Sequence, residues 1–195
     1  MHAPPDGPLH AHSIAETFLF AQLTYCPHCR RRPVRPAERL RATGGGRDPW
    51  LLAVECAGCG RGTELRFLID PPPRSPEQPD ARINPTPARS DLIDLAGWVT
   101  LARGIIDGAQ KTGQRDERRD LLLEAEQCLG EAMKFFEPGR DDPCDDAFFT
   151  EASRARAKEH PDAFSRSTIV ALRSKLPTGA RGPQIKPRRP WWKWW

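Results

Sequence analysis

The sequence is 195 residues long and lacks any apolar run close to the roughly 18 to 20 residues that a membrane-spanning helix requires. Residues 1–13 contain neither a basic start nor the apolar stretch of about 7 to 15 residues that marks a secretory signal. Both absences favour a cytoplasmic protein, in which thiols stay reduced. Under those conditions cysteines in Cys-x-x-Cys spacing indicate a metal site rather than a disulfide.

Apolar residues are also scarce, at 38% of the chain, whereas proline occurs 21 times. Proline is densest in residues 71–90, and no helix or central strand tolerates that density. We therefore expect a proline-rich linker at 71–90 between two small units, at 17–70 and 91–177. Residues 1–16 are expected to form a disordered leader, and residues 178–195 a basic, tryptophan-rich tail.

Charge is distributed unevenly along the chain. Residues 91–172 contain 11 basic and 17 acidic residues, a net charge of −6, whereas residues 173–195 contain seven basic and no acidic residues. The formal net charge of +4 therefore hides an acidic middle and a basic end. Such asymmetry indicates interactions between segments or with an anionic surface.

Three runs in the first unit have the aromatic and aliphatic composition of β-strands, namely TFLFAQLTY, WLLAVE and TELRFLI. The segment PVRPAERLRAT is expected to form a further strand, after which Gly44, Gly45 and Gly46 turn the chain back. So small a unit buries only a limited core, and a structural metal would add the stability that the core lacks.

Two cysteine pairs flank these strands, Cys26 with Cys29 and Cys56 with Cys59. A two-residue gap lets one tight turn present two sulfurs to a tetrahedral metal ion. Gly60 follows the second pair and suits the left-handed conformation of such a turn, whereas Arg30 takes this place after the first pair. The 26 residues between the pairs exceed the usual spacing of about 15 to 20, and a two-strand excursion would fill them.

With CPHC and CAGCG, residues 17–69 resemble the zinc-ribbon group and, more loosely, uncharacterised bacterial proteins that couple such a ribbon to a small helical domain. The resemblance implies a four-thiolate structural zinc at Cys26, Cys29, Cys56 and Cys59. Disulfides and redox-active thiols are alternatives, and His28 is an alternative ligand. A closed four-thiolate site leaves no position for a substrate water, so we expect no catalysis by this zinc and no enzyme.

The stretch from Arg30 to Arg41 contains six arginines, opposed only by Glu38. Clustered arginines of this kind contact nucleic-acid phosphates, so a nucleic-acid-binding ribbon is the alternative function. Few aromatic residues flank the arginines for base stacking, and four thiolates with one zinc(II) would cancel the positive charge of the unit. We therefore favour a non-catalytic binding or adaptor module.

The second unit shows helical periodicity, which predicts about four helices at 91–113, 115–137, 145–158 and 162–176. The fold class is thus α+β, with a β zinc ribbon and an all-α bundle. Gly97, Gly104 and Gly108 are spaced to allow a close approach of a second helix. Cys128 falls on an apolar helix face and reads as a core residue, whereas acidic neighbours of Cys144 would suppress its thiolate.

The tail carries four of the six tryptophans of the chain within five residues. The candidate docking residues are Trp191, Trp192, Trp194, Trp195, Arg188, Arg189 and Lys193. Tryptophans beside cations favour the interface of an anionic membrane, although the tail is too short to span one. Docking onto a protein partner, folding back onto the acidic helices and inert disorder are the alternatives. A peripheral membrane location would accompany the first reading.

Overall fold

The computed structural model describes residues 7–30, 34–37, 40–44, 48–70 and 82–178. Within this part, the chain divides into two compact units between Pro87 and Ala88. The first unit contains a small sheet and one α-helix, and the second contains the four other α-helices. The mixed α+β organisation predicted from the sequence is confirmed at this level.

The strands of the first unit form one sheet in the order β1-β5-β4-β2, with β3 also paired to β4. Their bounds are Leu9–Ala11 (β1), Val34–Pro36 (β2), Arg41–Ala42 (β3), Trp50–Cys56 (β4) and Gly62–Ile69 (β5). β1 runs parallel to β5, and the other pairs are antiparallel. The predicted strands WLLAVE and TELRFLI thus lie within β4 and β5, whereas PVRPAERLRAT holds two short strands, not one long one.

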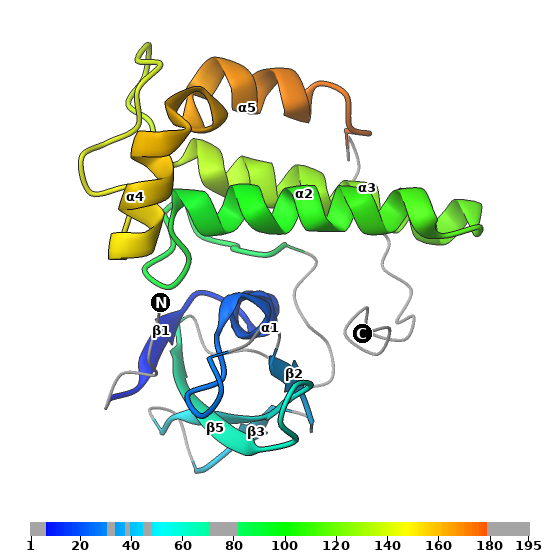
Figure 1. Ribbon diagram of the computed structural model, residues 1–195, viewed down its shortest axis with the longest axis vertical. Coiled ribbons are helices and arrows are strands. Elements are labelled where there is room, and N and C mark those ends of the chain that lie inside the picture. Colours follow the sequence, from blue (N-terminus) through cyan, green and yellow to red (C-terminus); the bar gives the residue numbers. More distant parts are fainter. Residues whose placement is uncertain (1–6, 31–33, 38–39, 45–47, 71–81, 179–195) are drawn as a thin grey trace. The chain divides into compact units, whose positions relative to one another are not determined.

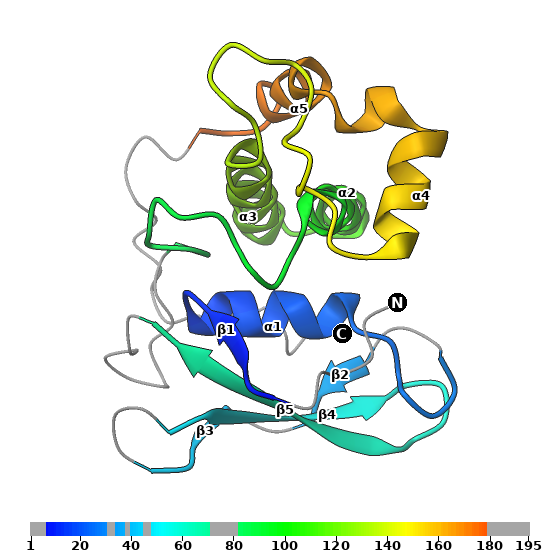
Figure 2. The ribbon, with the colours of Figure 1, turned by 90° about the vertical axis from the view of Figure 1, so that its left-hand side faces the viewer.

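Alternation along β4 and β5 places apolar side chains on one face of this sheet. Leu52, Val54, Leu65, Phe67 and Ile69 are buried on that face. Helix α1 (Ile14–Leu23) lies across it, as Figure 2 shows, and the rings of Phe20 and Phe67 meet edge to face at 6.1 Å. The core of the unit therefore lies between one helix and one sheet.

The predictions for residues 1–25 are wrong in two respects. TFLFAQLTY lies largely in α1 and not in a strand, and part of the supposed leader is ordered in β1 and the start of α1. Ser13 is the N-cap of the helix, since its hydroxyl accepts the Glu16 amide at 3.1 Å. The Ser-x-x-Glu sequence is an N-terminal helix signal that outweighs the strand-like composition behind it.

The predicted linker extends too far. Its first part, residues 71–81, lies outside the described residues. Ile83 is buried in the first unit, where its carbonyl oxygen accepts a hydrogen bond from Ser13 Oγ, and Ser90 is buried in the second unit. These side-chain contacts order a stretch in which proline density alone predicts a spacer.

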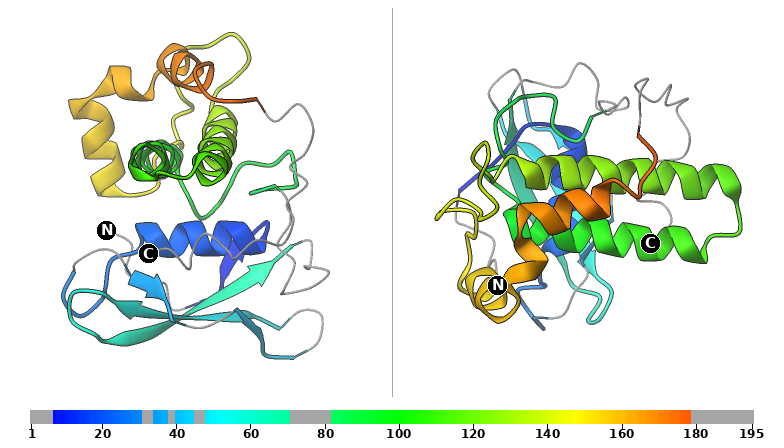
Figure 3. Two further views of the ribbon diagram at one scale, coloured as in Figure 1. Left: turned by 90° about the vertical axis from the view of Figure 1, so that its right-hand side faces the viewer. Right: turned by 90° about the horizontal axis from the view of Figure 1, so that it is seen from above.

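The helices of the second unit are α2 (Leu95–Lys111), α3 (Arg115–Met133), α4 (Glu151–Glu159) and α5 (Arg166–Arg173), with a 3-10 turn η1 (Pro161–Phe164) between the last two. α2 and α3 lie side by side and antiparallel (Figure 1). α5 lies over this pair of helices. The pair is longer, and in the right panel of Figure 3 it continues past the end of α5. The four predicted helices are present, with shorter bounds.

Capping residues account for the shorter bounds. Asp94 caps α2, because its Oδ1 accepts the Gly97 amide at 2.8 Å while its Oδ2 accepts the Phe149 amide at 3.0 Å. Ser165 begins a new helix after η1 by accepting the Thr168 amide at 3.2 Å. The last predicted helix is therefore divided in two.

The sequence predicts that Gly97, Gly104 and Gly108 allow a close approach of a second helix. This role does not hold at Gly104. This residue is exposed on α2, and a methyl group at its Cα would meet no atom within 4 Å. Gly104 thus carries the backbone-entropy cost of glycine within a helix without a packing reason for it.

Gly104→Ala should raise the free energy of unfolding by about 1 kcal/mol, the difference in helix propensity between the two residues. Denaturant titration followed by circular dichroism measures this change. Gly139, which has a φ of 81°, is the matched control, and its replacement by alanine should destabilise by about 1 kcal/mol. A loss of stability in Gly104→Ala would mean that something covers this face of α2.

Candidate metal centre

Cys26 and Cys29 lie on a tight turn directly after α1. The helix ends at Thr24, whose hydroxyl donates to the carbonyl oxygen of Phe20 at 2.9 Å. The Arg30 amide donates to the carbonyl oxygen of Cys26 at 2.9 Å, which closes the turn. Arg30 adopts the left-handed conformation, with a φ of 56°.

Cys56 and Cys59 lie on an equivalent turn at the tip of the β4–β5 hairpin. Here the Gly60 amide donates to the carbonyl oxygen of Cys56 at 2.8 Å, and Gly60 has a φ of 68°. The Gly58 amide is directed at the Cys56 sulfur, at 3.3 Å. Both turns therefore share one hydrogen bond and one left-handed residue, as the paired motifs predict.

The two turns bring all four sulfurs together. Cys26 Sγ lies 3.6 Å from Cys59 Sγ, and Cys29 Sγ lies 3.5 Å from Cys56 Sγ. All four Sγ atoms lie within 4.8 Å of one another. Four thiolates bound to zinc at about 2.3 Å in a tetrahedron would have sulfurs about 3.8 Å apart, so the cluster fits this metal.

Burial differs among the four cysteines. Cys26 and Cys56 are each 1% exposed, Cys29 is intermediate and Cys59 is exposed. Cys56 lies on the buried face of β4 together with Leu52 and Val54. One side of the cluster is thus part of the core, and the other faces solvent.

The thiols of Cys56 and Cys59 have different pKa values because their hydrogen bonds differ. The Gly58 amide lowers the pKa of Cys56 to about 7, although burial opposes this effect. The Arg61 amide lowers the pKa of Cys59, but burial and hydrogen bonds with the other three cysteines outweigh it and raise the pKa to about 11. At neutral pH the Cys59 thiol therefore keeps its proton, which a metal that binds thiolates must displace, whereas Cys56 is partly ionised.

His28 lies outside the group of four sulfurs. Its side chain is exposed between the two cysteines of the first turn, and its Nδ1 lies 3.5 Å from Nη1 of Arg61. Arg30 and Arg61 are also exposed at this end of the unit. The surface next to the sulfurs is therefore basic.

The described arginines of the Arg30–Arg41 stretch are Arg30, Arg35 and Arg41; the other three lie outside the described residues. Arg35 lies opposite Glu55 in the β2–β4 pairing, and Arg41 lies 3.7 Å from Glu64. Cross-strand carboxylates thus reduce the positive charge that the sequence places there.

The two remaining cysteines are apart from the cluster. Cys128 is fully buried on α3, where burial and the carboxyl groups of Glu124 and Glu131 raise the pKa of its thiol. Burial also raises the pKa of Glu124 to about 8. Both groups are therefore held neutral inside the helical unit, which disfavours a thiolate nucleophile at Cys128.

Tail residues Arg188 to Trp195 lie outside the described residues, and in the part that is described no helix is both long and apolar enough to cross a membrane.

Comparisons with protein-family models, curated proteins and solved structures found no match. The resemblance to zinc ribbons therefore rests on the two cysteine turns themselves.

The shared left-handed position gives a matched pair of substitutions. Arg30→Gly should raise the free energy of unfolding of the first unit by about 1 kcal/mol, because glycine adopts this conformation without steric strain. Gly60→Ala should lower it by a similar amount. Thermal unfolding of the metal-loaded protein measures both, and opposite signs are expected. A change of the free energy of unfolding in the same direction in both variants would contradict the equivalence of the turns.

Proposed function

We propose that Cys26, Cys29, Cys56 and Cys59 hold one structural zinc ion and that the protein is a non-catalytic binding or adaptor module. The observation that carries this proposal is the convergence of four sulfurs from two equivalent turns. Four protein thiolates complete a tetrahedron, so the metal would have no open position for substrate.

The location of the cluster supports a structural role. It joins the end of α1 to the tip of the β4–β5 hairpin, and both elements enclose the small core of the first unit. Zinc bound by such ligands contributes on the order of 10 to 16 kcal/mol to the folding of small domains. A sheet covered by one helix gains more from this contribution than a large core would.

Under this proposal binding is a property of the surface and of the tail. Trp191, Trp192, Trp194 and Trp195 beside Arg188, Arg189 and Lys193 would place indole rings at the headgroup level of an anionic membrane. A protein partner with an apolar, acidic surface is the second possible target. The tail would then hold the two units at that surface from the cytoplasmic side.

Nucleic-acid binding is the alternative function, and the basic surface beside the sulfurs favours it. Arg30, Arg61 and His28 are exposed there together. The same side chains also have a simpler role, because four thiolates with one zinc(II) carry a net charge of −2 that nearby cations stabilise. We therefore keep the adaptor as the proposed function.

Removal of one ligand tests the zinc proposal. The purified protein should contain one zinc ion per chain by elemental analysis, and Cys26→Ser or Cys59→Ser should lose it. The first unit should unfold in these variants while the helices of the second unit remain, as amide hydrogen exchange would measure. Cys144→Ser, which alters a cysteine outside the cluster, is the control and should keep full zinc content.

Full zinc occupancy in either ligand variant would contradict the assignment. Zinc that depends on His28 as well as on three cysteines would replace the four-thiolate site by a mixed one. Zinc affinity should also fall as the pH falls, because protons compete for the thiolates.

Vesicle binding tests the tail. The full chain should cosediment with anionic vesicles at low salt and show a blue shift of tryptophan emission, because indole rings leave water at the interface. Deletion of residues 187–195 should abolish both effects, whereas neutral vesicles are the control and should bind weakly.

Absence of cosedimentation at low salt would contradict membrane docking. A blue shift without vesicles that salt removes would indicate that the tail folds back onto the acidic helices. Binding to nucleic acid that weakens steeply with salt and needs Arg30 and Arg61 would favour the alternative function.

A further inference from the structure

Two pockets open on the helical unit and share one residue, Arg103 of α2. The first has a volume of about 530 Å³ and is lined by Arg103, Arg156, Glu159, His160 and the residues of η1. The second has a volume of about 400 Å³ and lies between α2 and α5. Because Arg103 lines both pockets, a ligand of its guanidinium can extend into either.

Arg156 is held in place by its neighbours. Its Nη1 donates to Oγ1 of Thr100 at 2.9 Å, and that hydroxyl donates to the carbonyl oxygen of Ala96 at 2.7 Å. Thr100 and Arg103 are three residues apart and share one face of α2. The guanidinium of Arg156 is thus fixed on the α2 side of the pocket, with further N–H groups available to a ligand.

The described residues provide no carboxylate within ion-pair distance of Arg103 or Arg156. Three other arginines of the same unit do have such partners: Arg89 with Asp146, Arg140 with Glu137 and Arg173 with Glu126. Arg154 and Arg166 of the same unit also have no carboxylate partner among the described residues, so Arg103 and Arg156 are distinguished by the pocket that they share. Two arginines at one pocket remain without carboxylate partners in an acidic unit.

His160 also lines this pocket. It lies four residues after Arg156, as the C-cap residue of α4. The carboxylates at the rim are those of Glu159 and Asp162. Glu159 lies 3.9 Å from the His160 ring and its side chain is 74% exposed, so solvent screens it.

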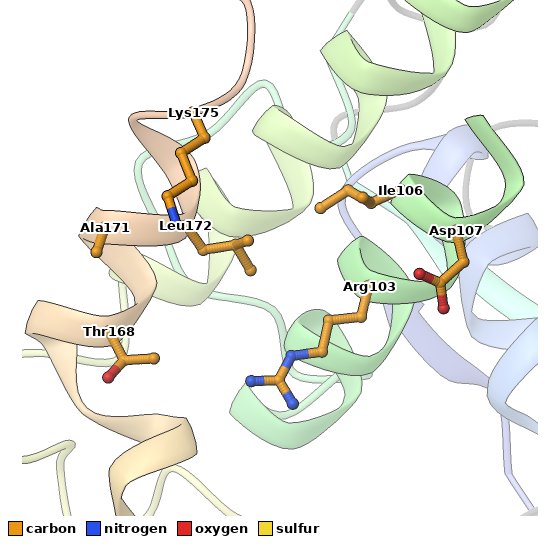
Figure 4. A pocket seen from close by; sticks show the side chains of 7 residues that line it. All are labelled: Arg103, Ile106, Asp107, Thr168, Ala171, Leu172 and Lys175. Atoms are coloured by element: carbon orange, nitrogen blue, oxygen red, sulfur yellow. The ribbon is translucent and has the colours of Figure 1, made fainter. Parts of the chain in front are cut away.

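The adjoining pocket has a different character. Ile106 of α2 and Ala171 and Leu172 of α5 form apolar walls, and Figure 4 shows Arg103 extending from α2 toward the side where Thr168 lies. Lys175 and Asp107, one cation and one carboxylate, complete the lining of this pocket, and Asp107 lies four residues after Arg103 on α2. An apolar surface thus continues directly from the guanidinium of Arg103.

We propose that this double pocket binds a small organic anion. Its phosphate or carboxylate group would contact the guanidinium groups of Arg103 and Arg156, and its apolar body would lie against Ile106 and Leu172. Arginine is suited to this task because its planar donors match the oxygens of both kinds of group. This site is independent of the cysteine cluster.

Titration of the full, zinc-loaded chain with phenyl phosphate at constant ionic strength tests the proposal. Amide NMR shifts should saturate and be largest at Thr100, Arg103, Arg156 and His160. Arg103→Gln and Arg156→Gln should each weaken binding about tenfold or more, because each removes a charge-assisted hydrogen bond. Both residues are exposed, so neither substitution should alter the fold.

Arg154→Gln is the matched control. Arg154 is an exposed arginine of the same helix, but its guanidinium donates to the carbonyl oxygens of Phe148 and Phe149 and does not line the pocket. Its replacement should leave the affinity unchanged. Shifts that do not saturate, or equal losses in all three variants, would show only general attraction between anion and protein and would overturn the site.

Inorganic phosphate tests the apolar half of the site. It should bind more weakly than phenyl phosphate, and Ile106→Ala should reduce the difference between the two ligands while leaving phosphate binding unchanged. Equal affinity for both ligands would overturn the apolar contact. Phenylacetate distinguishes the two anionic groups, since binding comparable to that of phenyl phosphate would assign the site to carboxylates as well.

Discussion

The meeting of four sulfurs is the constraint on which the first unit depends. Cys26 Sγ and Cys59 Sγ lie 3.6 Å apart although the two residues are 33 positions apart in the chain. Reduced thiols alone gain little from this proximity, and thiolates without a cation would repel one another. A metal ion would remove that repulsion and would hold the end of α1 against the β4–β5 hairpin. The short strands of this unit are understandable if the metal supplies much of its stability.

Ion pairs occur in both units of the described chain. Cross-strand ion pairs such as Arg41 with Glu64 occur on the sheet, and Arg173 with Glu126 joins α5 to α3. Exposed pairs of this kind add little to stability and mainly determine which side chains remain available for ligands. Arg103 and Arg156 are among the arginines that this pairing leaves available, and both line one pocket.

Local sequence signals predict much of this structure. The Cys-x-x-Cys turns, the alternating residues of β4 and β5, and the apolar faces of α2 and α3 follow from spacing alone. The aromatic and aliphatic residues of α1 predict a strand in place of the helix. Ser13 and Glu16 are the local signal that favours a helix. The parallel pairing of Leu9 with Phe67 joins distant segments, and no local pattern specifies such a partner. The pocket that Arg103 and Arg156 share is formed by α2, α4 and η1, and the sequence does not predict how these elements pack.

X-ray absorption at the zinc edge of the zinc-loaded chain is the most direct test of the four-thiolate site, because it reports the ligand atoms themselves. We expect four sulfur ligands at about 2.3 Å and no nitrogen or oxygen ligand. Three sulfurs with one nitrogen would assign His28 or another histidine to the metal. An oxygen ligand would open the site to water, and would contradict the structural, non-catalytic role proposed for the cluster.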